Sequence, residues 1–165
     1  MDAYLDIETT GLSPFSDAIT VVGVYRETPE GFILRQLVGR DVTRPNLTAV
    51  LDGVKHLYTY NGDRFDLIFI QSRLGLELKS HIEHTDLMRA CWCKGLYGGF
   101  KAVERQLGIE RTLQDVSGRD AVDLWWRYIR RGDNRALRIL LDYNREDVVN
   151  LKALRERLGG EQPVQ

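Results

Sequence analysis

Residues 6–12 read DIETTGL and follow a short segment in which apolar and polar residues alternate. The apolar residues at positions 3, 5 and 7 give a period of two, which predicts a β-strand over residues 3–7. Side chains two positions apart on a strand point to the same face, so we expect Asp6 and Glu8 to lie together. Two carboxylates on a buried face repel each other, and a divalent cation would compensate for their charge. The alternative is an edge strand whose polar face is exposed to water.

The rest of the chain predicts an α/β pattern without internal repeats. Residues 18–25 and 31–38 are expected to be strands that form an antiparallel meander with the first one. The later expected elements are a helix over 46–54, a strand over 56–60, a helix over 64–73, a strand within 81–87, and helices over 100–107, 120–131 and 134–158. Glycines at positions 75, 108 and 132 would end helices, and Asp120 would be an N-cap. This order predicts three layers around a mixed sheet.

The composition limits the class of protein. The 165 residues suit one domain, which we expect over residues 1–158, with a frayed, flexible tail over 159–165. The net charge of −1 disfavours a protein that coats nucleic acid by electrostatics alone, but acidic metal ligands could offset basic contacts in a nucleic-acid enzyme. No apolar run approaches the roughly 18–20 residues of a membrane span, and the N-terminal acids are unlike a signal peptide. A cytoplasmic protein without a membrane partner is therefore expected.

The sequence also predicts where the two cysteines and the three tryptophans lie. Cys91 and Cys93 are expected to be buried, reduced thiols, because their spacing to the nearby histidines matches no common zinc pattern. The tryptophans at positions 92, 125 and 126 are expected in the core rather than as stacking platforms for bases.

Two further acidic residues occupy informative positions. Asp66 stands where a predicted strand leads into a helix, and α/β sheets carry active sites at such strand ends. Its alternative role is to stabilise the helix N-terminus, for which Asp63 competes as an N-cap. Tyr143 and Asp147 are four residues apart and share a helix face that flanks the apolar stripe. Alternatively, Tyr143 packs in the core while Asp147 is solvated.

Residues 6–12 resemble the first motif of the DEDD superfamily of 3′–5′ exonucleases, the DnaQ-like group. Its six fixed letters would arise by chance in about one chain per 10⁵ of this length. The second motif of that family has Asn, three residues, an aromatic residue and Asp. Asn61, Phe65 and Asp66 match it in the same order.

The third motif separates the branches of this superfamily. Tyr143 and Asp147 match the Tyr-x-x-x-Asp motif of the tyrosine (DEDDy) branch. The histidine branch requires His at position 142, which is Asp in this chain. The chain is most similar to the stand-alone YprB-like ribonuclease H-like exonucleases.

This resemblance implies both a fold and a catalytic set. The fold would be ribonuclease H-like, with three layers and a mixed sheet of about five strands flanked by helices. The catalytic set would be Asp6, Glu8, Asp66, Tyr143 and Asp147. The four acids would hold two divalent ions, Mg²⁺ or Mn²⁺, about 3.5–4 Å apart, and Tyr143 would orient the attacking water.

The resemblance also implies substrate contacts near the first two motifs. The backbone at Thr9 would meet the terminal 3′-hydroxyl, and Leu12 would wedge against the terminal base. Phe65 would stack on a base, although core packing is an equal alternative for Leu12 and Phe65. Asn61 belongs to the substrate-binding candidates, but it is expected chiefly to fix the turn before the helix. Asp86 is expected to support the site without binding metal.

The implied function is a metal-dependent 3′–5′ exonuclease that removes nucleoside 5′-monophosphates from single-stranded DNA or RNA 3′ ends. One alternative is a ribonuclease H-like endonuclease, which the loop over residues 9–12 and the Tyr-x-x-x-Asp motif disfavour. Another is a catalytically silent nucleic-acid-binding module, which a missing carboxylate would indicate, whereas all four are present. The sequence does not distinguish DNA from RNA. It leaves open whether a separately encoded helicase or polymerase is a partner.

Overall fold

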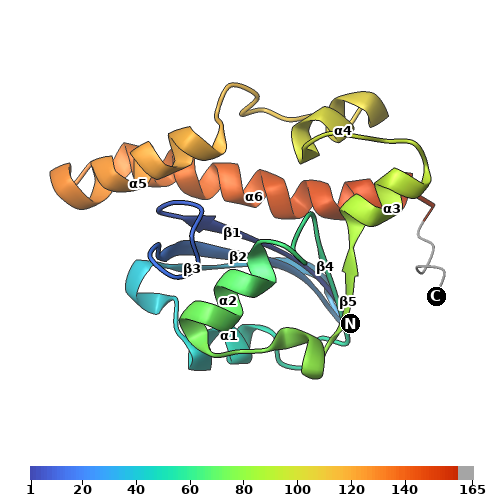
Figure 1. Ribbon diagram of the computed structural model, residues 1–165, viewed down its shortest axis with the longest axis horizontal. Helices are drawn as coiled ribbons and strands as arrows, with labels where there is room; N and C mark the ends of the chain where they lie inside the picture. Colours follow the sequence, from blue (N-terminus) through green and yellow to red (C-terminus); the bar gives the residue numbers. More distant parts are fainter. Residues whose placement is uncertain (160–165) are drawn as a thin grey trace.

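A mixed five-stranded sheet with the order β3-β2-β1-β4-β5 forms the centre of the computed structural model, which describes residues 1–159 (Figure 1). The strands are β1 (Asp2–Thr9), β2 (Ile19–Thr28), β3 (Gly31–Val38), β4 (His56–Thr59) and β5 (Glu83–Asp86). The first three form the predicted antiparallel meander, while β4 and β5 run parallel to β1. Because β1 is the middle strand, the alternative of an edge strand with an exposed polar face is wrong. Most of the tail predicted over 159–165 lies outside the described residues.

Helices cover both faces of the sheet and complete the predicted three-layer α/β architecture (Figure 1). On one face lie α1 (Arg44–Val50) and α2 (Asp66–Leu74). The long helix α6 (Asn134–Arg157) crosses the opposite face. The remaining helices on that side are α3 (Leu87–Cys93), α4 (Phe100–Leu107) and α5 (Gly118–Arg131). Among residues 1–159, no helix has the length and apolar character that crossing a membrane requires.

The alternation in β1 separates the two hydrophobic cores. Leu5 and Ile7 pack with residues of α1 and α2, whereas Tyr4 packs with Leu151 and Leu154 of α6. Burial of both faces explains why β1 is central, and it places the polar side chains of β1 beneath α6. The acidic pair therefore faces the helix that carries Tyr143 and Asp147.

Three predicted helix ends are confirmed, whereas two predicted helix N-caps are wrong. Glycines at positions 75, 108 and 132 end α2, α4 and α5 in the left-handed conformation, as predicted. The N-cap of α5 is Ser117, not Asp120, because the two side chains form a reciprocal capping box. Asp63 does not cap α2, since its carboxylate forms ion pairs with Lys79 and Arg89. The short helix α3 was not predicted.

The cysteine and tryptophan expectations hold only in part. Cys91 is buried, but Cys93 is exposed, and both thiols are free. Trp125 is buried, whereas 38% of Trp92 is exposed. Within the part of the chain that the structure describes, side chains spaced for metal binding form one acidic cluster, which contains no cysteine.

Candidate functional site

Three of the four predicted acids meet at one end of the sheet. Oxygens of Asp6 and Glu8 on β1 and of Asp147 on α6 all lie within 4.8 Å of one another. They line a cavity of about 520 Å³, together with residues from the loop after β1 and from the start of α5. Tyr143 lines the same cavity. The structure therefore brings the two predicted pairs, one on a strand and one on a helix, into a single site.

A glycine in β2 allows α6 to approach the sheet this closely. Gly23 pairs with Asp6 across the two strands, and a Cβ atom at Gly23 would lie 2.8 Å from Asn144 Cγ and closer still to Oδ1. The Asn144 amide donates hydrogen bonds to the Asp6 carboxylate at 3.0 Å and to its backbone oxygen at 3.3 Å. Gln36 of β3 donates to Asn144 Oδ1 at 3.0 Å. Asn144 thus fixes α6 over β1, three residues before Asp147.

Asp66 lies beside this cluster rather than within it. It is the first residue of α2 and is only 3% exposed. Its Oδ1 accepts a hydrogen bond from the backbone N–H of Ile7 at 3.1 Å, which ties α2 to β1. Burial, together with the charges of Asp86 and Asp147, raises the pKa of Asp66 to about 7.

The electrostatics of the cluster favour a cation. Burial raises the pKa values of Asp6 and Glu8 well above their usual range, and the nearby charge of Asp147 raises them further. Burial also raises the pKa of Asp147 to about 6, against the opposing effect of Arg111. Among residues 1–159, Glu8 Oε1 is buried without a hydrogen-bond partner. A free carboxylate oxygen among other carboxylates fits a hard divalent cation.

Tyr143 is both a core residue and a residue of the site. It is 8% exposed and packs against apolar residues of α5 and β2 while lining the cavity. The Lys101 ammonium lies 5.1 Å from its ring centroid, and the Arg111 guanidinium lies 5.7 Å from it. Burial, followed by the charge of Asp147, raises the pKa of Tyr143 above its usual value. The phenol therefore stays protonated at neutral pH and can donate a hydrogen bond.

The loop after β1 provides the mouth of the cavity. Thr9 and Leu12 line it, and 84% of Leu12 is exposed, so the core-packing alternative for Leu12 is wrong. Thr9 Oγ1 donates to the Gly11 carbonyl at 2.6 Å, which shapes the loop. Phe65 lines the cavity while packing against Phe69 at a centroid distance of 4.9 Å. Phe65 therefore packs against the core, as one alternative expected, and it also lines the cavity.

The second motif also contains residues that support the site from outside. Asn61 has a φ of 62° and so forms the turn before α2, as predicted. Its N–H donates to Asp86 Oδ1 at 2.8 Å, and the Asp63 N–H donates to Asp86 Oδ2 at 3.2 Å. Asp86 also caps α3 through the Met88 N–H at 3.0 Å. Neither Asn61 nor Asp86 is among the described residues that line the cavity.

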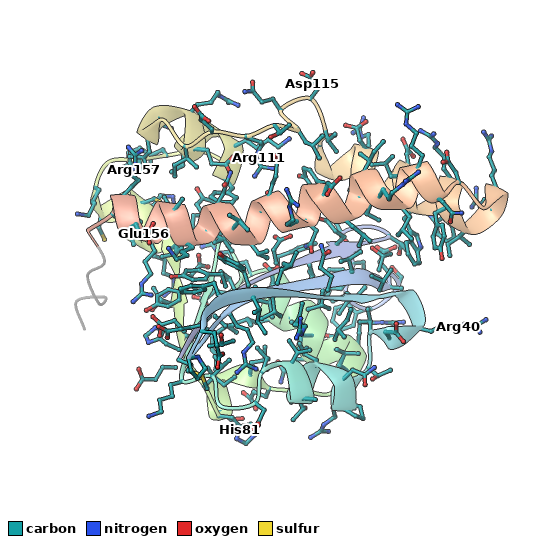
Figure 2. The ribbon with its side chains drawn as sticks, turned by 180° about the vertical axis from the view of Figure 1, so that it is seen from behind. Arg40, His81, Arg111, Asp115, Glu156 and Arg157 are labelled. Atoms are coloured by element: carbon teal, nitrogen blue, oxygen red, sulfur yellow. The ribbon has the colours of Figure 1, made fainter. Side chains whose placement is uncertain are left out.

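Two groups of site residues were not anticipated from the sequence. Gly118, Arg119 and Val122 at the start of α5 line the cavity. Arg111, in the loop between α4 and α5, lies over α6 (Figure 2). It donates a hydrogen bond to Asp147. An arginine in a loop has no periodic pattern that could have revealed its partners.

The chain matches known proteins in sequence and in fold. A family model described as "RNase_H superfamily" matches residues 3–159. An uncharacterized protein of Methanocaldococcus jannaschii is 27% identical over an alignment of 157 residues, and the match covers 88% of this chain and 88% of that one. Among solved structures, 95% of this chain superposes on the family B DNA polymerase of Pyrobaculum calidifontis with a TM-score of 0.71 and 17% identity. This chain spans only 24% of that polymerase.

A second solved structure, described as the apo form of a nuclease, gives a TM-score of 0.66 and 22% identity. The match covers 96% of this chain and 72% of that one. At these identities, the two solved structures show a shared fold and nothing finer.

Proposed function

Because the chain belongs to the RNase_H superfamily, we propose that it is a metal-dependent 3′–5′ exonuclease of the tyrosine (DEDDy) branch, similar to the YprB-like enzymes. It would release nucleoside 5′-monophosphates from single-stranded DNA or RNA. The observation that carries the proposal is the meeting of Asp6, Glu8 and Asp147 within 4.8 Å at the wall of a cavity. The ribonuclease H-like fold predicted from the motifs is the fold of this superfamily.

The donor set suits Mg²⁺ or Mn²⁺. Asp6, Glu8 and Asp147 would hold the ions, with Asp66 beside them, and the unpartnered oxygen of Glu8 offers a free donor. When bound, such ions lower the pKa of a coordinated water and offset the charge on the scissile phosphate. The raised pKa values fit this assignment, because carboxylates buried together are costly to ionise without a counter-charge.

Other residues of the chain would orient the reactants. Tyr143, held protonated, would donate a hydrogen bond that positions the attacking water. The backbone of Thr9 and the exposed side chain of Leu12 would receive the terminal nucleotide at the cavity mouth. Phe65 would offer a ring face to a base, a contact that tolerates any sequence.

A separately encoded polymerase or helicase would suit this chain as a partner. The family B DNA polymerase that this chain resembles is much longer, because the match covers only 24% of it. In that protein the same fold therefore occurs together with the other parts of a polymerase. Co-purification with each candidate class would test this part of the proposal.

The decisive experiment is digestion of 5′-labelled single-stranded DNA and RNA in Mg²⁺ or Mn²⁺, with the Asp6→Asn variant as the matched control. We expect progressive shortening from the 3′ end, mononucleotide products, and no reaction in excess chelator. A 3′-phosphate should block digestion, because it adds charge and bulk where a hydroxyl is expected. Equal cleavage of closed circles and linear strands would indicate an endonuclease. Binding without any cleavage by the wild-type chain would indicate a silent binding module.

A further inference from the structure

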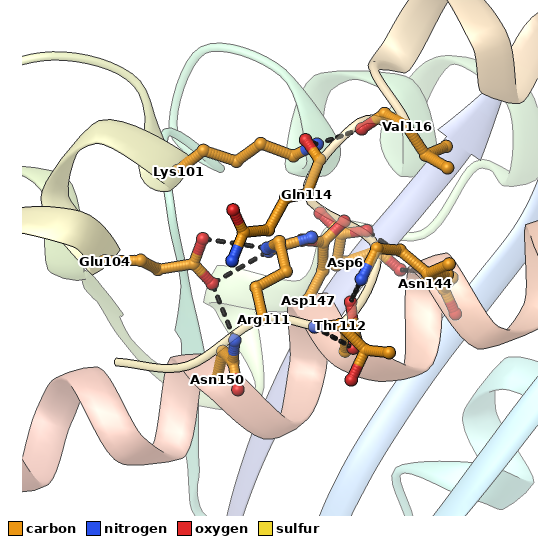
Figure 3. Close-up of polar contacts among 12 residues, drawn as sticks. Asp6, Lys101, Glu104, Arg111, Thr112, Gln114, Val116, Asn144, Asp147 and Asn150 are labelled. Carbon is orange, nitrogen blue, oxygen red and sulfur yellow. Dashed lines mark hydrogen bonds and ion pairs between the residues drawn. The ribbon is translucent and has the colours of Figure 1, made fainter. Parts of the chain in front are cut away.

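A buried network of polar side chains connects Asp147 to helix α4 (Figure 3). The Arg111 guanidinium donates to Glu104 from Nε at 2.9 Å and from Nη2 at 2.8 Å. The same Nη2 donates to Asp147 Oδ1. Asn150 Nδ2 donates to Glu104 Oε1 at 2.8 Å. The network therefore contacts α6 at two residues, Asp147 and Asn150, which lie about one helical turn apart.

The loop that carries Arg111, residues 108–117, is fastened to α6 next to Asp147. The Glu146 carboxylate accepts hydrogen bonds from the backbone N–H groups of Thr112 at 2.8 Å and Leu113 at 3.0 Å. These bonds fix the backbone immediately after Arg111. The guanidinium is therefore presented to Asp147 from an anchored position.

The contacts of Arg111 exceed what a structural ion pair with Glu104 needs. The two bonds to Glu104 already form a complete fork, and the bond to Asp147 is additional. The Arg111 side chain is 4% exposed, and its guanidinium lies 5.8 Å from the ring centroid of Phe100 and 5.7 Å from that of Tyr143. Arg111 is not among the described residues that line the cavity, so it would reach the site through Asp147.

We infer that Arg111 is a positioning residue for metal binding by Asp147: it holds one carboxylate oxygen, which leaves the other oxygen available to the cavity. The inference rests on the proposed function, because it takes Asp147 to be a metal ligand. A ligand that is already oriented loses less freedom when the cation binds. Removal of such supporting contacts typically lowers metal affinity or activity about 10- to 100-fold.

The test measures Mn²⁺ binding to the purified chain by titration calorimetry without substrate, alongside kcat and KM for a labelled oligonucleotide. Arg111→Met alone would leave Glu104 as a buried unpaired charge, so the main variant combines Glu104→Gln with Arg111→Met. We expect cooperative thermal unfolding of this double variant. Its Mn²⁺ affinity should be about tenfold lower or more, and its kcat about 10²-fold lower with little change in KM.

A single variant, Arg111→Lys, separates the effect of charge from that of geometry. Arg111→Lys keeps the positive charge but cannot hold two carboxylates in one fork, so its kcat and Mn²⁺ affinity should be well below wild type. This variant remains informative if the double variant does not fold. The matched control is Arg105→Met on α4, where an exposed arginine is removed and wild-type values are expected.

The outcomes distinguish this inference from the proposed function. Wild-type Mn²⁺ affinity and kcat in the folded double variant would overturn the role of Arg111 alone. Full kcat in Arg111→Lys would do the same, because charge without the fork would then suffice. Absence of Mn²⁺ binding to the wild-type chain would overturn both proposals.

Discussion

The Asp6 carboxylate is surrounded by the negative charges of three other acids. Its pKa is raised by burial and then by the charges of Asp147, Glu8 and Asp66. Asp6→Asn keeps the size of the side chain and its contact with Asn144, but removes one of these charges. At pH 8.5 without metal, we expect the variant to be about 1–2 kcal/mol more stable to urea than wild type, because repulsion is relieved.

The same variant should be inactive, since the proposed metal ligand on β1 is lost. Oligonucleotide digestion in Mn²⁺ measures this directly, with urea unfolding as the control for the fold. An Asp6→Asn chain that digests at the wild-type rate would remove Asp6 from the catalytic set.

Tyr143 tests whether a phenol positions water or merely fills space. Tyr143→Phe preserves the ring contacts of a residue that is 8% exposed, so the fold should be retained. Loss of one orienting hydrogen bond should lower kcat about 10²-fold while KM and Mn²⁺ affinity stay nearly unchanged. Steady-state kinetics between pH 6.5 and 8.5 measure the effect. A wild-type kcat across that range would assign Tyr143 to the core alone.

Residues within short local motifs were predictable, whereas residues that act through distant contacts were not. Asp6 with Glu8, and Tyr143 with Asp147, are two and four positions apart, so strand and helix periods alone place each pair on one face. Arg111 has partners that are 7 and 36 residues away on two different helices. Its role depends on how those helices pack, which no local pattern in the sequence expresses.

At the scale of secondary-structure elements, the approach of α6 to the sheet depends on Gly23. In Gly23→Ala, the new methyl group would collide with Asn144, so α6 must move away from β1 or Asn144 must give up its bonds to Asp6. We expect a loss of about 1–3 kcal/mol in unfolding free energy together with a loss of activity.

A double-mutant cycle in urea unfolding checks the cause of this loss. Gly23→Ala combined with Asn144→Ala should be less destabilised than the sum of the two single variants, because the collision is then absent. Simple additivity would show that the close approach is not the cause.

Element boundaries were predictable where one residue type determines them. Helix ends at glycines 75, 108 and 132 follow from the left-handed conformation that glycine adopts readily. The seven-residue helix α3 was missed because it is too short for an apolar period and is begun by Asp86, whose side chain also binds a distant turn. The sequence-based prediction put the N-cap of α5 three residues too late, at Asp120. In the structure Ser117 is the N-cap, and the Ser117 and Asp120 side chains each accept a hydrogen bond from the other residue's backbone N–H.

At the scale of the whole molecule, the buried acids make stability depend on pH. Asp66, with a pKa of about 7, and Asp147, with a pKa of about 6, bind more protons in the folded chain than in the unfolded chain near neutrality. Their contribution to stability is therefore complete below their unfolded pKa values and is lost as pH rises through their folded ones. His84, whose pKa is lowered by burial, opposes this trend only up to about pH 6.5.

We therefore expect the metal-free chain to lose stability as pH rises from about 4 to about 7, the interval between the unfolded and folded pKa values of these two acids, and Mn²⁺ to reverse the loss at the upper end of this range. Each proton released on unfolding changes the free energy of unfolding by about 1.4 kcal/mol per pH unit. Urea unfolding in chelator and in Mn²⁺, at several pH values across this window, measures both effects. Identical pH profiles with and without Mn²⁺ would contradict a metal site at these acids.

The order in which the site residues occur along the chain has a consequence for protein synthesis. All five strands end by Asp86, whereas Tyr143 and Asp147 belong to the last helix, α6. A ribosome therefore makes all five strands, which include Asp6 and Glu8, before it makes Tyr143 and Asp147 of the proposed site. Stalled chains that end before residue 143 should leave labelled RNA intact in a translation extract. Under the proposed function, this order along the chain would delay nuclease activity until α6 has been made.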